Sequence, residues 1–215
     1  MQVSTKDAGW QDSGAALRRE LAVDALVNRM LYGDEEPLSC LMINLPGALA
    51  HQIQEWVEVN IQDEDLYVDE EDDCRRKTET HVTLKFGLLE QKPSEKTAEI
   101  IQDCQPFDIK LTEVGLFRSE KYDVVWVGVE SPCLHALNRD ISAQVPVRDT
   151  FSTYNPHVTV TYVQKGTADH LEGQQVIQQE GKLGSQSPEK ATFQATEVVF
   201  SSGDRTCKQV IPLGS

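Results

Sequence analysis

The tripeptide His-Val-Thr occurs twice in the chain, at residues 81–83 and 157–159, each time at the head of an apolar run. The same order of features precedes both copies: an alternating strand pattern, a helix that starts at a proline, and a polar loop. A repeated order of this kind predicts a duplicated unit. The simplest architecture that accommodates it is an α+β fold of two related halves.

Hydrophobic periodicity predicts the same elements in both copies. The first copy is predicted to contain strand 39–45, a helix from Pro46, strand 81–88, a helix over about 94–104 and strand 107–117. The second is predicted to contain strand 123–130, a helix from Pro132, strand 157–163 and closing strands within 191–203 and 208–213. The two pseudo-repeats are therefore expected at about 38–118 and 119–213.

Residues 1–37 are expected to form an N-terminal helical extension to a main domain at 38–215. Apolar residues between positions 23 and 31 follow the i, i+3, i+4 spacing of an amphipathic helix, which is predicted over residues 14–32,. Pro37 follows the polar break after this helix,.

The charge of the chain limits its partners. It has 215 residues and a formal net charge of −15, with 20 basic against 35 acidic side chains. A protein that holds long nucleic acid neutralises phosphates with clustered Lys and Arg, and this sequence has no basic run. Long duplex nucleic acid is therefore disfavoured as a partner, whereas a small nucleotide or short oligonucleotide is compatible with this charge.

The sequence has no stretch long and apolar enough to span a bilayer, and its N-terminus lacks the apolar core of a signal peptide,. Its five cysteines are scattered and form no Cys-x-x-Cys pair,. These features predict a cytoplasmic protein with free thiols and no association with a membrane. They do not indicate an oligomeric state.

Alternation along a strand places Val82 and Val158 on one face, and the histidine and threonine of each copy on the other. The apolar faces are expected to pack under helices, which leaves the polar pairs on the open face. If a pseudo-two-fold axis relates the halves, the pairs that meet at one site are His81 with Thr83 and His157 with Thr159. By the same alternation Lys85 shares the polar face, whereas Phe86 and Tyr162 point to the core.

This set of side chains suits phosphoester chemistry. Two imidazoles that titrate near neutrality can act as base and acid on opposite sides of one phosphorus. The threonine hydroxyls can donate to the non-bridging oxygens, where transition-state charge collects, and Lys85 would add a positive charge there. Such donors replace a metal ion, so neither a metal nor a cofactor is expected. A metal site is also disfavoured because each His-x-Thr supplies only one metal ligand.

The runs His-Val-Thr-Leu-Lys-Phe at 81–86 and Pro-His-Val-Thr-Val at 156–160 resemble the paired His-x-Thr/Ser-x motifs of the two-histidine (2H) phosphoesterase superfamily. That superfamily includes the 2'-5' RNA ligase-like proteins and RNA cyclic phosphodiesterases, and the resemblance covers roughly residues 38–213. It implies a duplicated, bilobal α+β fold with two antiparallel sheets around a central groove and helices outside. It also implies an acid/base pair, His81 and His157, and two phosphate-binding hydroxyls, Thr83 and Thr159.

Three aromatic residues are candidates for binding a nucleobase. Trp126 lies opposite the apolar face of its strand by alternation and is close to Gly128, so it could serve as a stacking platform,. A tryptophan covered by a neighbouring loop is the alternative interpretation. Tyr154 and Tyr122 are further candidates for the same role.

The acidic segment 63–73 lacks the Asp-x-Asp-x-Asp-Gly register and the closing glutamate of an EF-hand loop,. It is interpreted as a solvated loop, or as a segment at the groove entrance that repels polyanions. His51 and His135 lie in predicted helices and His170 lies in a polar segment, so these three are interpreted as surface histidines.

Together these features predict a metal-independent phosphodiesterase, a hydrolase acting on a small nucleotide or oligonucleotide. Its target would be a 2',3'-cyclic phosphate, a 2'-5' linkage or a cyclic oligonucleotide signal. Two alternatives use the same residues: a nucleotide-binding module without turnover, and an RNA-end-processing or 2'-5' ligase-like enzyme. An interaction scaffold, which would neither bind nor cleave a nucleotide, is a third.

Overall fold

The computed structural model describes residues 37–68, 80–148, 151, 153–177 and 191–214. The strands are β1 (Ser39–Asn44), β2 (His81–Leu88), β3 (Phe107–Arg118), β4 (Tyr122–Glu130), β5 (His157–Gln164), β6 (Thr192–Ala195), β7 (Glu197–Ser201) and β8 (Lys208–Pro212). The helices are α2 (Gly47–Asn60), α3 (Glu95–Gln102) and α4 (Pro132–Gln144), with short 3-10 helices η1 (Asp63–Asp65) and η2 (Asp169–Leu171). The helix predicted over 14–32 lies outside the described residues.

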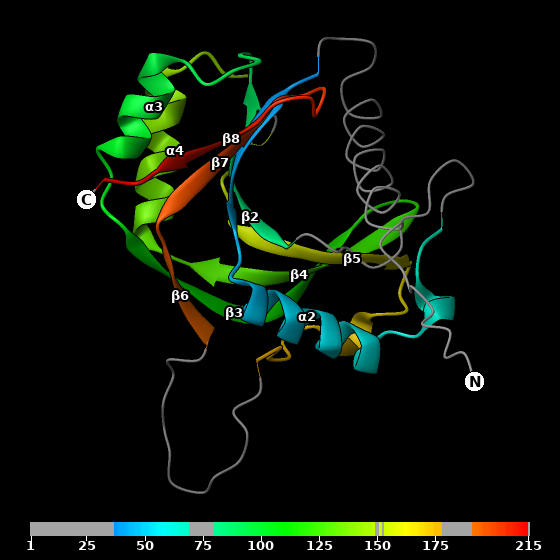
Figure 1. Cartoon of the computed structure of the whole chain (residues 1–215). Coiled ribbons are helices and arrows are strands. Elements are labelled where there is room, and N and C mark those ends of the chain that lie inside the picture. The colour runs from blue at the N-terminus through cyan, green and yellow to red at the C-terminus, as the bar shows by residue number, and fades with distance from the viewer. Residues whose placement is uncertain (1–36, 69–79, 149–150, 152, 178–190, 215) are drawn as a thin grey trace, which may run out of the picture.

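All eight strands form one antiparallel sheet in the order β6-β3-β4-β5-β2-β1-β7-β8. The strands with the two His-Val-Thr runs, β2 and β5, are neighbours at its centre and share a single ladder pair, Val82 with Val158. The sheet curls on either side of this seam, with four strands in each half (Figure 1). The predicted α+β class is confirmed, and the two expected sheets are joined edge to edge at the seam.

Each long helix packs on the half of the sheet that it does not follow in sequence. Helix α2 comes after β1 but packs against β5, and α4 comes after β4 but packs against β2, while α3 packs against α4 and β8 (Figure 1). The side chains that α2 buries are Leu49, Ile53, Trp56 and Val57, the stripe expected for an amphipathic helix,. None of the helices in the described ranges is both long and apolar enough to cross a membrane.

The segment 191–203, predicted to contain a closing strand, instead forms two strands in different halves. Strand β6 pairs with β3, and β7 pairs with β1. Thr196 lies between them, and its carbonyl accepts a hydrogen bond of 2.9 Å from the backbone N–H of Leu213. The chain therefore passes from one half to the other at this residue, which links the halves a second time.

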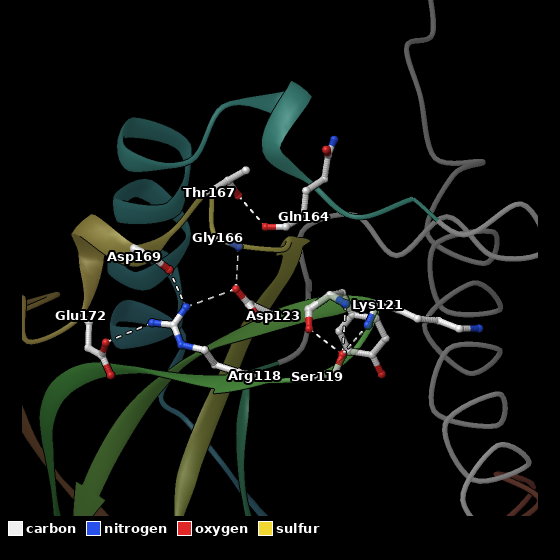
Figure 2. Close-up of polar contacts among 10 residues, drawn as sticks. Arg118, Ser119, Lys121, Asp123, Gln164, Gly166, Thr167, Asp169 and Glu172 are labelled. Atoms are coloured by element: carbon white, nitrogen blue, oxygen red, sulfur yellow. Dashed lines mark hydrogen bonds and ion pairs between the residues drawn. The ribbon is translucent and has the colours of Figure 1, made fainter.

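A buried carboxylate ties the segment after β5 to the β3–β4 hairpin (Figure 2). The Asp123 side chain is fully buried and accepts hydrogen bonds from the backbone N–H of Gly166, at 2.8 Å, and from the guanidinium of Arg118, at 3.4 Å. Arg118 also binds the carboxylates of Asp169 and Glu172. This network holds the end of β3, where Phe117 precedes Arg118.

Candidate active site

The seam between β2 and β5 fixes how the two motifs face each other. Val82 and Val158 are paired and fully buried, so the residues beside them point to the opposite face of the sheet,. We call that opposite face the motif face; the half-buried side chains that define it are His81, Thr83, His157 and Thr159. In the antiparallel register His81 lies across from Thr159, and Thr83 lies across from His157,.

Side chains directly opposite each other in a sheet have Cβ atoms about 4.5–5.5 Å apart, and diagonal neighbours about 7–8 Å apart. The two threonines therefore each face the histidine of the other motif, and the two histidines are diagonal neighbours. This arrangement allows two imidazoles to approach one phosphorus from different sides while two hydroxyls reach its oxygens.

A bulge in β2 changes the alternation directly after the first motif. Met42 of β1 pairs with Thr83 and Leu41 pairs with Lys85, which leaves Leu84 as an extra residue,. Lys85 thereby shares the face of the fully buried Leu41 and is itself only 6% exposed. The expectation that Lys85 lies on the polar face with the histidines is therefore wrong.

An equivalent bulge follows the second motif in β5. Val125 of β4 pairs with Thr161 while the next residue pairs with Thr159, so Val160 is the extra residue. Thr161 is buried with Val125, whereas Tyr162 is half-buried on the motif face. In β2 the bulge likewise turns Phe86 to this face. Both aromatic residues were predicted to point to the core, and both bulges overturn that prediction for the same reason.

Side chains from the second half of the sequence bind the two backbone carbonyls at the β2 bulge. The Tyr154 hydroxyl donates to the carbonyl of Thr83 at 3.0 Å, and the Asn138 amide of α4 donates to the carbonyl of Leu84 at 2.7 Å. Burial raises the pKa of Tyr154 well above its usual value, so the phenol stays protonated and remains a donor,. Tyr154, predicted as a substrate contact, therefore lies in a position from which it orients Thr83.

His157 has a defined hydrogen bond on one ring nitrogen. Its Nδ1 lies 2.7 Å from the carbonyl oxygen of Asn155, which can only accept. Nδ1 therefore carries the proton and donates it, and Nε2 of the neutral ring holds a lone pair. An imidazole in this tautomer is prepared to accept a proton at Nε2.

Trp126 lies on the motif face, as alternation predicted, but its ring is covered. A Cβ atom on Gly115, its partner in β3, would lie 2.1 Å from the indole, so the indole packs flat on the backbone there. The Phe117 ring stacks on the indole with centroids 5.0 Å apart and planes 26° apart. Phe117 is 37% exposed, and its ring lies 4.9 Å from that of His157.

Sequence reasoning missed Phe117 because β3 also contains an irregularity. Leu111 pairs with Val129 and Val114 pairs with Val127, so two residues of β3 face one of β4. Simple alternation from Phe107 would place Phe117 in the core. The shift places Val114 in the core instead, and Phe117 moves to the motif face.

Tyr122 lies at the far end of β4 in a cluster of three tyrosines. Its ring lies 4.9 Å from that of Tyr67 and 5.4 Å from that of Tyr162. The backbone N–H of Tyr67 donates to the carbonyl of Tyr162 at 3.0 Å, so the chain after η1 runs along β5. The acidic residues of η1 are thereby placed beside the second motif strand.

The remaining histidines lie at the surface, as predicted, since His51, His135 and His170 are all exposed. In the described part of the chain no group of three or more His, Cys, Asp or Glu side chains could hold a metal ion. Independence from metal stays a prediction, because it concerns the reaction and not the side chains alone.

The family of the chain follows from a match over most of its length. A family model described as the 2'-5' RNA ligase superfamily matches residues 45–206. The chain belongs to this superfamily. Both His-Val-Thr runs of this 2'-5' RNA ligase superfamily member fall inside the matched residues, and the predicted resemblance to 2H phosphoesterases is confirmed.

Solved structures of other proteins have a fold similar to that of this chain. Usb1 of Kluyveromyces marxianus is similar with a TM-score of 0.52 at 14% identity, over 83% of this chain and 99% of that one. The structure of the same protein with uridine monophosphate has a TM-score of 0.50 at 14% identity, over 82% of this chain and 99% of that one. E. coli LigT complexed with phosphate has a TM-score of 0.46 at 20% identity, over 83% of this chain and 96% of that one. A comparison with curated protein sequences finds no significant match.

Proposed function

We propose that this chain is a metal-independent phosphodiesterase that cleaves a small nucleotide or short oligonucleotide with His81, Thr83, His157 and Thr159. The observation that carries the proposal is the register of β2 and β5, in which each histidine lies across from the threonine of the other motif. Membership of the 2'-5' RNA ligase superfamily supports the reaction class. A structure of similar fold, that of Usb1, was solved with uridine monophosphate, which supports a nucleotide as the ligand.

In the proposed reaction His157 is the base and His81 the acid. For a 2',3'-cyclic phosphate, a water oxygen bonds to phosphorus and gives its proton to Nε2 of His157. The bond from phosphorus to one ribose oxygen breaks, and that oxygen takes a proton from His81. The product is a phosphomonoester beside a free ribose hydroxyl. The hydrogen bond from Nδ1 of His157 to the carbonyl of Asn155 supports this order, because in the neutral ring it keeps the proton on Nδ1 and the lone pair on Nε2,.

The same residues serve a linkage that has a free neighbouring ribose hydroxyl. That hydroxyl then takes the place of water, the distant nucleoside leaves, and a cyclic phosphate is the product. The reverse of this step is ligation, so an RNA-end-processing or 2'-5' ligase-like activity would use the same geometry. Thr83 and Thr159 donate to the non-bridging oxygens, where loss of one such donor typically lowers kcat by roughly 10²–10³-fold.

The test is turnover in EDTA on a panel of 2',3'-cyclic, 2'-5'-linked and cyclic oligonucleotides. We expect His81→Ala and His157→Ala each to lower kcat by about 10²–10⁴-fold, and the wild type to show a bell-shaped pH profile of kcat/KM. His51→Ala, a substitution of an exposed histidine on α2, is the matched control and should keep full activity.

The other outcomes separate the alternatives. Tight binding with no product on any member of the panel supports a nucleotide-binding module and contradicts the enzyme. Turnover that EDTA abolishes contradicts metal independence. If the chain neither binds nor cleaves any member of the panel, only the interaction scaffold remains.

A further inference from the structure

Phe117 is an aromatic side chain that is exposed to solvent beside the proposed base. It lies near the end of β3, with 37% of its surface exposed, and its ring is perpendicular to that of His157 at a centroid distance of 4.9 Å. A large apolar side chain loses free energy when it stays in contact with water. Its position beside His157 places this exposed aromatic surface within reach of a molecule bound at the proposed site.

The packing beneath Phe117 makes it a rigid support. Its ring lies on the indole of Trp126, which in turn lies flat on the backbone at Gly115. Any residue larger than glycine at position 115 would displace the indole, because a Cβ there would be 2.1 Å from it. The end of the same strand is held by Arg118, which binds the buried Asp123 (Figure 2). These contacts therefore fix both the position and the orientation of the Phe117 ring.

We propose that the ring of Phe117 stacks on the nucleobase of the nucleotide bound at His157, and thereby selects substrates with an unpaired base. This inference rests on the proposed function, since it names the class of substrate that the same site takes. The bases inside a duplex stack on their neighbours on both sides and offer no free face. Single-stranded ends, loops and free nucleotides do offer one.

The place of Phe117 also relates stacking to catalysis. A base on Phe117 would hold its own ribose near His157, which accepts a proton from the attacking water or hydroxyl. Phe117 thus acts through position and takes no part in bond making. The set of polar side chains at the seam is complete without it, so its contribution should depend on the presence of a base.

The test compares two ligands that differ only in the base. Adenosine 5'-monophosphate and ribose 5-phosphate are titrated into the full chain by calorimetry, with wild type, Phe117→Ala, Phe117→Leu and Phe117→Trp. Base–aromatic stacking predicts that Phe117→Ala weakens the nucleotide by about tenfold or more and ribose 5-phosphate by less than about twofold. Phe117→Leu keeps apolar bulk without an aromatic face and should resemble Phe117→Ala, whereas Phe117→Trp should restore binding.

The matched control is Val210→Ala on β8, which removes exposed apolar surface at the opposite edge of the sheet and should change neither affinity. Equal weakening of both ligands, unchanged binding of the nucleotide by Phe117→Ala, or no binding of the nucleotide by the wild type would each overturn the inference. If only the proposed function is wrong, base-dependent binding through Phe117 persists, but no member of the substrate panel is cleaved.

Discussion

Tyr154 positions the backbone of Thr83 through a hydrogen bond between the two motifs. Its hydroxyl donates to the backbone carbonyl of Thr83 at 3.0 Å, and Thr83 lies across from His157. Tyr154 belongs to the loop that leads into the second motif, whereas Thr83 belongs to the first. The hydrogen bond therefore joins the two motifs from the side of the loop.

We expect Tyr154→Phe to reduce the free energy of unfolding by about 1 kcal/mol near neutral pH, because the carbonyl of Thr83 loses its donor,. We also expect kcat to fall more than KM changes, since Thr83 is less well placed while the ligand contacts remain. Urea denaturation and steady-state kinetics measure the two effects. Thr167→Val, which removes a hydroxyl that donates to the backbone carbonyl of Gln164 at 2.8 Å, is the control for kcat.

The same residue predicts a dependence of stability on pH. Burial raises the pKa of Tyr154 in the folded state above the value of about 10 that it has when unfolded,. Between the two values the unfolded state binds fewer protons, so the stabilisation is complete below pH 10 and is lost as pH rises further. Wild type should therefore lose stability above about pH 10 more steeply than Tyr154→Phe. Parallel curves for the two proteins would contradict this assignment.

At the scale of elements, a side chain of a helix is hydrogen-bonded to the bulge in β2. The extra residue Leu84 has a carbonyl that accepts from the Asn138 amide at 2.7 Å, and Asn138 belongs to α4, which packs on β2. Helix and bulge therefore support each other. The bulge in turn decides which side chains after the motif reach the motif face.

Asn138→Ala should leave the carbonyl of Leu84 without this donor and destabilise the fold by about 1–3 kcal/mol,. We expect kcat to fall as well, because Thr83 directly precedes the bulge. Arg139→Ala is the matched control, since Arg139 is an exposed neighbour on the same helix and its loss should cost little. Chemical denaturation of the two variants gives the comparison, and equal midpoints would show that the bulge does not need Asn138.

The elements also show what the sequence could and could not predict. Strand β2 begins and ends where alternation placed it, and Pro46 and Pro132 lie at the helix starts as expected. Alternation failed for Lys85, Phe86 and Tyr162, because in each strand a bulge lies between the motif and these residues. A bulge depends on cross-strand register and on contacts such as the one from Asn138, which lie far away in sequence. The pattern within one strand therefore does not show it.

At the scale of the whole molecule, the net charge of −15 opposes the approach of any polyanion,. Acidic residues of η1 contribute to this charge beside the C-terminal end of β5, because the backbone N–H of Tyr67 donates to the carbonyl of Tyr162 and so brings this segment against β5. The sequence interpretation of segment 63–73 as a barrier to polyanions concerns the same residues, of which those after position 68 lie outside the described part. If such a charge barrier exists, kcat/KM should depend on the salt concentration.

Since enzyme and substrate repel each other, kcat/KM should rise as ionic strength is raised from about 0.01 to 0.15 M, where the screening length shortens from about 30 to 8 Å. The rise should be steeper for a hexanucleotide than for a dinucleotide, because the longer substrate carries more charge. A basic nucleic-acid-binding protein shows the opposite trend, since salt weakens its phosphate contacts. Stopped-flow or initial-rate measurements on both substrates give the slopes.

If η1 forms the barrier, amide substitution of Asp63, Glu64 and Asp65 should flatten the slope for the hexanucleotide and raise its kcat/KM at low salt. The matched control removes the same number of carboxylates from the exposed side of α3 and its C-cap, at Glu95, Glu99 and Asp103. Because α3 packs against β8 and α4, away from β5, that variant should keep most of the wild-type slope. Equal flattening by both variants would mean that total charge, and not its place beside β5, limits the approach of long substrates.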